Sequence, residues 1–149
     1  MQTLATDVRI RPANELDLQA IIEIDEKIGG SYRPEVWERR LAYYIRRDPD
    51  SSVVAEIEGK VVGFMLGEVR SGEFGLDEPT GWVEVLGVDP SCRGLRIGQR
   101  LAEAMFEHFR GRGAAIVRTL VEAERGDLTR FFASLGFEAG SLLPLVKHL

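Results

Sequence analysis

The chain contains a single cysteine, Cys92, and two histidines, His108 and His148, among its 149 residues. One cysteine cannot form an intramolecular disulfide, and a chain without disulfides suits a reducing compartment, so we expect a cytoplasmic protein. The two histidines are isolated, and no grouping of Cys, His, Asp and Glu has the spacing of metal ligands. We therefore expect no metal site. Cys92 has no histidine beside it in the sequence, so it is not favoured as a nucleophile.

Long apolar segments and an excess of positive charge are also missing. The longest apolar runs extend over only a few residues, far short of a transmembrane helix or the apolar core of a signal peptide, so we expect no membrane association. The formal net charge is −5, which argues against nucleic acid as the main partner. The Gly-x-Gly-x-x-Gly turn that a dinucleotide-binding Rossmann fold needs after its first strand is absent as well.

The composition that remains is that of an ordinary globular protein, with 44% apolar and 29% charged residues. This balance excludes a disordered or collagen-like chain. A chain of this length can bury roughly two-thirds of its unfolded surface, and no linker, internal repeat or low-complexity stretch interrupts it. We therefore expect one domain over residues 1–149.

Hydrophobic periodicity predicts an α/β protein of the α+β type, in which antiparallel hairpins dominate. Asn14 begins the first helix, with Asp17 completing a capping box, and Pro34 suits the first turn of the second. Glu58-Gly59 indicates a tight hairpin turn, and Gly136 a left-handed helix cap. We expect a mixed, mostly antiparallel twisted sheet of six to seven strands flanked by about four helices. The expected strands are 8–10, 53–57, 60–69, 82–88, 114–121, 137–139 and 142–146, and the expected helices begin after Asn14, at Pro34, near Ile97 and at Gly126 or Asp127.

The segment from Trp82 to Leu101 carries most of the functional information. An apolar run ends at Asp89-Pro90, a short loop rich in Arg and Gly follows, and a helix face then begins at Ile97. The first turn of a helix has N–H groups without partners and the positive end of the helix dipole, so this arrangement favours phosphate binding. Alternatively, the arginines only keep the helix surface soluble. They are Arg93, Arg96, Arg100, Arg110 and Arg112.

This segment resembles the acetyl-CoA-binding motif of the GNAT superfamily of N-acetyltransferases. The family pattern is Gln/Arg-x-x-Gly-x-Gly/Ala after a strand that ends in Val-x-Pro, and residues 93–98 follow Val88-Asp89-Pro90 here. Residues 131–137 are similar to the family's Leu-Tyr-x-x-Leu-Gly-Phe signature, and residues 10–13 to its opening. The resemblance covers nearly the whole chain and implies the GNAT fold.

Two positions depart from the family pattern. Arg96 replaces the first motif glycine, where it either crowds the pyrophosphate or adds a cation to its site. Phe132 replaces the tyrosine with which many members protonate the departing thiolate, and a phenylalanine cannot donate a proton. Tyr32, Tyr43 or a water could substitute, and the sequence does not choose among them.

The resemblance also implies where acetyl-CoA, the expected co-substrate, lies. A glycine inside a strand, here Gly87, often marks a bulge, and in the family such a bulge splays two strands and admits the pantetheine arm. The alternative is that Gly87 only relieves packing against the helix that follows. The cofactor-binding residues implied are Leu86, Gly87, Val88, Arg93, Gly94, Leu95, Arg96, Ile97, Gly98 and Gln99.

Attack on a thioester requires a neutral amine, and at pH 7 an alkyl ammonium of pKa near 10.4 loses its proton at a cost of about 4.6 kcal/mol. The first candidate for a general base is Glu84, on the strand that the resemblance assigns to the cofactor, with parity opposite to Val83 and Val85. The second is Glu122, at the end of the next strand. Either could act through a water, and either could instead be a solvated carboxylate without a role.

Two loops correspond to the acceptor side in the family, residues 29–33 and 71–79. They supply Tyr32, Glu73 and Asp77 as candidate substrate-binding residues, and acidic side chains there favour a cationic acceptor if they do more than confer solubility. We expect a cytoplasmic N-acetyltransferase that transfers the acetyl group of acetyl-CoA to a primary amine of a small molecule, protein or peptide, by direct attack in a ternary complex. A homodimer remains open. The alternative is a GNAT-like acyl-CoA-binding sensor or interaction module without turnover.

Overall fold

The computed structural model describes residues 7–149, which fall into two compact units, residues 7–119 and Leu120–Leu149. The first unit holds a five-stranded sheet in the order β1-β2-β3-β4-β5. The first three pairings are antiparallel and β4–β5 is parallel, as a mixed, mostly antiparallel sheet requires. Its strands are β1 (Val8–Pro12), β2 (Val53–Ile57), β3 (Lys60–Arg70), β4 (Thr80–Val88) and β5 (Ile116–Thr119).

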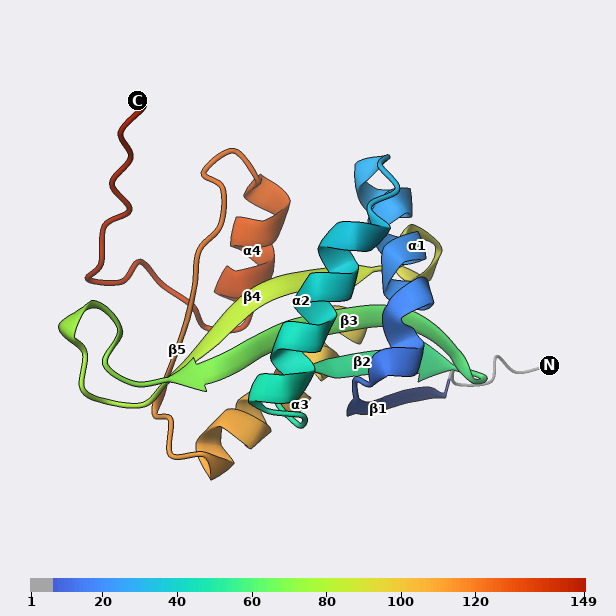
Figure 1. Cartoon of the computed structure of the whole chain (residues 1–149), viewed down its shortest axis with the longest axis horizontal. Helices are drawn as coiled ribbons and strands as arrows, with labels where there is room; N and C mark the ends of the chain where they lie inside the picture. The colour runs from blue at the N-terminus through green and yellow to red at the C-terminus, as the bar shows by residue number, and fades with distance from the viewer. Residues whose placement is uncertain (1–6) are drawn as a thin grey trace. The chain divides into compact units, whose positions relative to one another are not determined.

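Helices cover both faces of this sheet. Helices α1 (Leu18–Gly29) and α2 (Pro34–Arg47) lie across one face, and α3 (Ile97–Gly111) lies behind the other (Figure 1). The second unit contains α4 (Gly126–Ser134). Short 3-10 turns occupy Glu15–Asp17, Glu73–Gly75 and Pro90–Cys92. The predicted α+β class is confirmed, and no helix within residues 7–149 is long and apolar enough to cross a membrane.

The local predictions near the N-terminal half are confirmed. Asn14 accepts from Leu16 N while Asp17 accepts from Asn14 N, which is the predicted capping box. Glu58 and Gly59 both have positive φ, 51° and 81°, as the two-residue turn between β2 and β3 demands. Gly136 likewise has φ +94°.

The strands predicted at 137–139 and 142–146 are wrong. The structure assigns no strand to residues 135–149, so the described sheet has five strands instead of six or seven. An alternating apolar pattern describes which residues one face of a strand could bury, but a strand also needs a hydrogen-bonded neighbour. Residues 137–146 pair with no other strand in the described chain.

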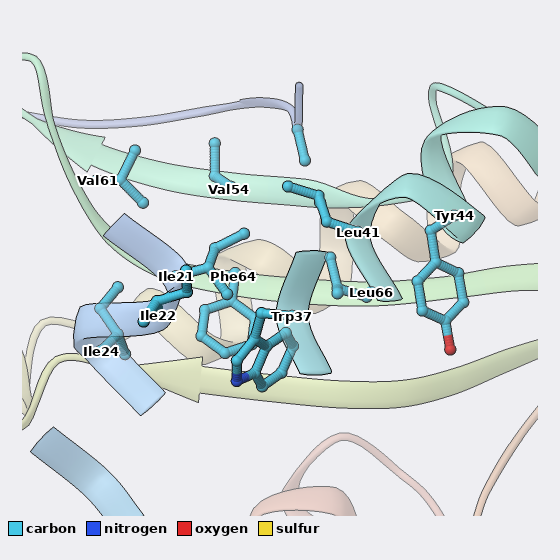
Figure 2. Packing of buried hydrophobic residues seen from close by; sticks show 11 residues of the cluster. Ile21, Ile22, Ile24, Trp37, Leu41, Tyr44, Val54, Val61, Phe64 and Leu66 are labelled. Carbon is cyan, nitrogen blue, oxygen red and sulfur yellow. The ribbon is translucent and has the colours of Figure 1, made fainter. Parts of the chain in front are cut away.

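The core under α1 and α2 packs against β3. Ile21, Trp37, Phe64 and Leu66 are each 2% exposed or less, and Trp37 meets Phe64 edge-to-face at 5.3 Å between ring centroids (Figure 2). Aromatic pairs in this geometry add to the free energy gained from burial alone. The cluster therefore fixes β3 against both helices.

The opposite face of the sheet receives α3 through the predicted stripe of apolar residues. Its members are 2% exposed or less: Ile97, Leu101, Met105 and Phe109. Glycines on the facing strands let the helix approach closely, since a Cβ on Gly63 would lie 3.0 Å from Ile97 Cγ2. A Cβ on Gly81 would strike the Phe109 ring. This packing sets the start of α3 beside the end of β4.

Candidate active site

The pairing between β3 and β4 contains a β-bulge at Glu84. Leu66 pairs with Val85 and Gly67 pairs with Val83, so Glu84 has no direct partner on β3. A bulge of this kind inserts one residue into a strand and reorients the side chains on either side of it. The sequence predicted a bulge at Gly87, and the structure has it three residues earlier.

The bulge changes which face each β4 residue occupies. Val85 packs against the core beneath α1 and α2, whereas Val83 lies opposite Gly67, whose missing Cβ would point to within 3.4 Å of Met105 on α3. The expectation that Val83 and Val85 share a face with Glu84 opposite both is therefore wrong. Uninterrupted period-two alternation does not apply where an extra residue enters the strand.

Gly87 has a packing role instead. It pairs in regular register with Phe64, and a Cβ at this position would lie 2.8 Å from the Phe64 ring and 3.2 Å from Ile28 Cδ1. Its contacts belong to the α1 face, not to α3 as the packing alternative assumed. Gly87 therefore leaves room for an aromatic core residue, and the assignment of a bulge to it is wrong.

The β4–β5 pairing stops partway along β4. The register runs from Thr80–Ile116 to Val83–Thr119, and within the described residues the stretch from Val85 to Val88 pairs with β3 only, after the unpaired Glu84. Thr119 Oγ1 donates to Val83 O at 2.8 Å at the last pair. Beyond this point the outer edge of β4 presents backbone N–H and C=O groups over about 13 Å of strand. An extended ligand with amide groups can bind such an edge.

The loop and helix start that follow β4 are the candidate anion site. Gly94 and Arg96 have positive φ, 89° and 59°, and α3 begins at Ile97 without a side-chain cap. The N–H groups of its first turn are therefore left for a ligand. Arg93 and Arg100 are exposed, as is Arg96, and none of them forms an ion pair with another described residue. Uncommitted cations beside a free helix N-terminus favour a phosphate group.

The other two arginines of the predicted cluster do not belong to this site. Arg110 and Arg112 lie at the opposite end of α3, about 20 Å along the helix axis. Arg110 pairs with Glu107, and Arg112 pairs with Asp48. The expectation that all five arginines lie near one ligand is therefore wrong, and the length of the helix predicted from Ile97 already separates them.

Asp89 anchors the start of the loop. Its Oδ2 accepts from Lys27 Nζ at 2.9 Å and its Oδ1 from Ser91 N at 3.0 Å, while the residue is 3% exposed. The Lys27 ammonium, followed by the Ser91 N–H, lowers the pKa of Asp89 to about 2. Because Lys27 lies near the end of α1, this ion pair connects that helix to the loop that leads into the anion site.

A group of polar side chains surrounds Glu84. Arg70 donates from Nη2 to Glu84 Oε1 and, at 2.9 Å, to Glu68 Oε2. Glu68 also accepts from Tyr43 Oη at 2.7 Å and from Arg47 Nε at 3.0 Å. The hydrogen bond to Glu68 raises the pKa of both Tyr43 and Arg47. The Glu84 carboxylate thus lies with residues on the α2 side of the sheet, and its side chain is 30% exposed.

Sequence reasoning missed Glu68 and the partner of His108. Glu68 is a single carboxylate in an otherwise apolar strand, which is the one signal that could have identified it. His108 Nε2 lies 2.9 Å from Asp48 Oδ2, so this histidine is isolated in sequence but not in space. Asp48 lies just after α2 and also pairs with Arg112, which connects helices on opposite faces of the sheet.

The remaining candidates are more dispersed. Tyr32 is 56% exposed between α1 and α2, and Glu73 and Asp77 are exposed on the loop between β3 and β4. The hydrogen bond to Glu68 is the largest cause of the raised pKa of Arg47, and the Glu73 charge also raises it, as the smallest of the causes. Glu122 belongs to the second unit, three residues beyond the end of β5, and is exposed.

Phe132 also belongs to the second unit, on α4. It packs edge-to-face on Phe131 at 5.1 Å and on Phe137 at 5.0 Å between centroids. Phe132 is therefore part of an aromatic cluster within that unit. Among residues 7–149, no group of three or more His, Cys, Asp or Glu side chains lies close enough to hold a metal ion.

The part of the chain that the structure describes is an α+β domain in which a bulged strand, unpaired on one edge beyond Val83, leads into a basic turn and a helix N-terminus that no side chain caps. The chain belongs to the acetyltransferase (GNAT) family, whose model matches residues 18–137. This finding confirms the resemblance recognised in the sequence.

Individual relatives support the same family. A mycothiol acetyltransferase of Acidothermus cellulolyticus is 33% identical over 153 aligned positions, which cover 91% of this chain and 46% of the relative. An acetyltransferase of Pectobacterium atrosepticum is 27% identical over 145 positions, 95% of this chain and 96% of the relative. The chain spans about half the length, or less, of the mycothiol acetyltransferases that it matches.

Solved structures agree on the fold. An aminoglycoside N-acetyltransferase in complex with CoA superposes with a TM-score of 0.84 at 18% identity, over 99% of both chains. Glucosamine-6-phosphate N-acetyltransferase from Arabidopsis thaliana gives a TM-score of 0.72 at 22% identity, over 95% of this chain and 98% of the other.

Proposed function

We propose that this protein transfers the acetyl group of acetyl-CoA to a primary amine, by direct attack within a ternary complex. The observation that carries the proposal is the order of three features along one strand and the turn after it. They are the Glu84 carboxylate at the bulge, the unpaired edge of β4 that follows it, and the anion site at the start of α3. A ligand with a polyphosphate, an amide-rich arm and a reactive terminus matches this order.

In this proposal the first turn of α3 and the free arginines bind the pyrophosphate of acetyl-CoA. The residues that would hold it are Arg93 and 94–99, with Leu86, Gly87 and Val88 along the arm. Helix N-termini and arginine guanidinium groups both favour phosphate oxygens, and the positive φ of Gly94 and Arg96 turns the backbone into the helix. Arg96 contributes a cation where the family pattern has glycine.

Glu84 is the proposed base. It takes a proton from the acceptor ammonium, directly or through a water, and the neutral nitrogen then attacks the thioester carbonyl carbon. The C–N bond forms and the C–S bond breaks, with the electron pair of that bond leaving on sulfur. The attacking nitrogen then loses its second proton, which passes to that sulfur or to water, so the products are the amide and coenzyme A. Tyr43 is one candidate for the acid that protonates the thiolate. Its O–H already donates a hydrogen bond to Glu68, so we do not assign it that role. Glu122 is the second candidate for the base.

The acceptor is proposed to be a cation that approaches from the side of Glu73 and Asp77. Tyr32, which precedes the N-terminal end of α2, stays a separate candidate contact. Mycothiol and aminoglycoside acetyltransferases among the similar proteins support an amine acceptor. A single cysteine supports the cytoplasm as the location. Acetyl-CoA and the amine are the only partners that we propose.

The test combines binding with turnover. Calorimetry with acetyl-CoA measures affinity, and release of free thiol against a panel of amines, including diamines, amino sugars and peptides, measures transfer. We expect micromolar binding and amine-dependent thiol release. Binding without release on any amine would instead support an acyl-CoA-binding module, for which Phe132 at the position of the family tyrosine is the supporting observation.

A further inference from the structure

Glu68 is an almost completely buried carboxylate to which the proposed chemistry gives no role. Its side chain is 2% exposed, and an ion removed from water costs several kcal/mol unless donors surround it. Three donors do so, from Tyr43 and Arg47 on α2 and from Arg70 on β3. Both oxygens of Glu68 are therefore occupied, and its position is fixed from two elements.

Arg70 is held by this carboxylate and by an aromatic ring. Its guanidinium carbon lies 5.8 Å from the centroid of the Trp82 ring, and its side chain is 22% exposed. The same nitrogen, Nη2, bonds Glu68 and Glu84. Glu68 and Trp82 are buried, so they hold the Arg70 side chain in one position. The Glu84 side chain is more exposed, and its hydrogen bond to Arg70 restricts its conformation.

The charges in this group balance. Glu68 and Glu84 carry two negative charges, and Arg47 and Arg70 carry two positive charges. Tyr43 is neutral, since its hydrogen bond to Glu68 raises its pKa. After the hydrogen bond to Glu68, the Glu73 charge, on the loop before β4, has a small additional effect on the pKa of Arg47, and in the described chain Glu73 makes no hydrogen bond to the group. Removal of Arg70 would leave two carboxylates close together with one cation, which favours protonation of the more accessible one.

We propose that Arg70 is a positioning residue for Glu84 and that Glu68 is the anchor that fixes Arg70. The inference rests on the function proposed above, in which Glu84 is the base. The bulge brings Glu84 to the α2 side of the sheet, and Arg70 then restricts its rotamers and keeps it ionised and able to accept a proton. A base held in one geometry is more effective than one that samples several.

A double-mutant cycle tests the coupling. Arg70→Gln, Glu84→Gln and the double variant are compared by kcat at saturating acetyl-CoA and amine. We expect Arg70→Gln to lower kcat about tenfold and to cause no further loss when Glu84 is already replaced. The acidic limb of its kcat/KM profile should move to higher pH. The inference would be overturned if the double variant lost kcat by the product of the two single losses, or if Arg70→Gln had a higher kcat than the wild type.

Arg11 provides a matched control. It is also 22% exposed and also bonds two carboxylates, Asp17 and Glu56, near the β1 edge of the sheet. Arg11→Gln should lower stability and leave the pH profile of the rate unchanged. Glu68→Gln loosens Arg70 but also removes a negative charge near Glu84, so it should lower kcat without moving the profile to higher pH. Arg70→Lys, which keeps the charge, should restore part of the rate. An Arg11→Gln profile that shifts as much as that of Arg70→Gln would contradict the specific role.

A second measurement does not depend on turnover. Carbon-13 NMR of labelled glutamate carboxylates, with Glu84 assigned from Glu84→Gln, follows the titration of this group in the wild type and in Arg70→Gln. A titration midpoint that moves upward in Arg70→Gln supports the pairing. An unchanged midpoint overturns the inference even if acetyl transfer is observed. Absence of thiol release from the wild type on any amine would contradict the proposed function, whatever the titration shows.

Discussion

Val83 and Val85 lie on opposite faces of β4 although only one residue separates them. Glu84 occupies the bulge between them, and its carboxylate meets Arg70 on the α2 side. A regular strand would have put Val83 and Val85 on one face and Glu84 on the other. The position of the proposed base is therefore a property of the register between β3 and β4.

The base assignment predicts a pH-dependent defect. Glu84→Gln keeps the shape of the side chain and removes its basicity, so the rate at pH 7 should fall about 10²-fold. The rate should partly recover as pH approaches the pKa of the free amine, since a neutral amine needs no base. Acetyl-CoA affinity should hardly change. Thiol-release rates across pH, with calorimetry alongside, provide the measurement.

Glu122→Gln is the comparison for this experiment. A loss confined to that variant would move the role of base to Glu122. If neither substitution changes the pH profile, the enzyme captures neutral amine from solution. An α-amino group, which costs only about 1.4 kcal/mol to deprotonate at pH 7, would then be the better acceptor.

Acetyl-CoA binding should depend on the second residue of α3. Gly98→Glu introduces a negative side chain beside the free N–H groups, so affinity should fall at least tenfold by calorimetry while the fold persists. Gly111→Glu serves as the control, because it adds the same side chain to the last residue of the same helix, where no atom lies within 4 Å of a new Cβ. Equal affinities for the two variants would remove the anion site from the start of α3.

Arg96→Gly should change stability and binding in opposite directions. Arg96 has φ 59° and ψ 28°, a left-handed conformation that costs a non-glycine residue about 1 kcal/mol. Glycine should therefore raise the free energy of unfolding by about 0.5–1 kcal/mol in urea denaturation. The loss of a cation should weaken acetyl-CoA binding several-fold and reduce its dependence on salt. Tighter binding by Arg96→Gly would show that the arginine crowds the site.

The Lys27–Asp89 pair should stabilise the protein only where Asp89 is ionised. Its folded-state pKa of about 2 lies below the ordinary 3.8, so its contribution is complete above pH 4 and is lost as pH falls toward 2. Asp89→Asn should lower the free energy of unfolding by about 1–2 kcal/mol at pH 7, because Asn retains the turn geometry but not the charge. The difference from the wild type should disappear near pH 2. A constant difference from pH 7 to pH 2 would mean that the ion pair is not its cause.

Features that depend on neighbouring residues in the chain were predictable from the sequence. The capping box at Asn14, the Glu58-Gly59 turn and the α3 stripe from Ile97 to Phe109 each follow from local spacing. The basic turn and the helix start that make up the candidate anion site were predictable for the same reason, since they are consecutive in the chain.

Features that depend on distant partners were not predictable. The bulge arises from how Gly67 and Leu66 on β3 pair with β4, which no periodicity within β4 reveals. Glu68 acquires its role from Tyr43 and Arg47, 25 and 21 residues earlier. The prediction of strands at 137–139 and 142–146 was wrong for the same reason. Their apolar patterns suit a strand, but no strand of the described chain pairs with them.

Because the β4–β5 pairing ends at Val83, backbone amides in the two halves of β4 should exchange hydrogen for deuterium at different rates. Amides of β4 from Thr80 to Val83 have hydrogen-bonded strands on both sides, whereas the stretch from Val85 to Val88 pairs on its β3 edge alone. Alternate amides in that stretch, those directed away from β3, should therefore exchange with deuterium far faster than their immediate neighbours, although they lie in the middle of the sheet. Their protection on addition of acetyl-CoA would record, amide by amide, how far the ligand extends along the strand.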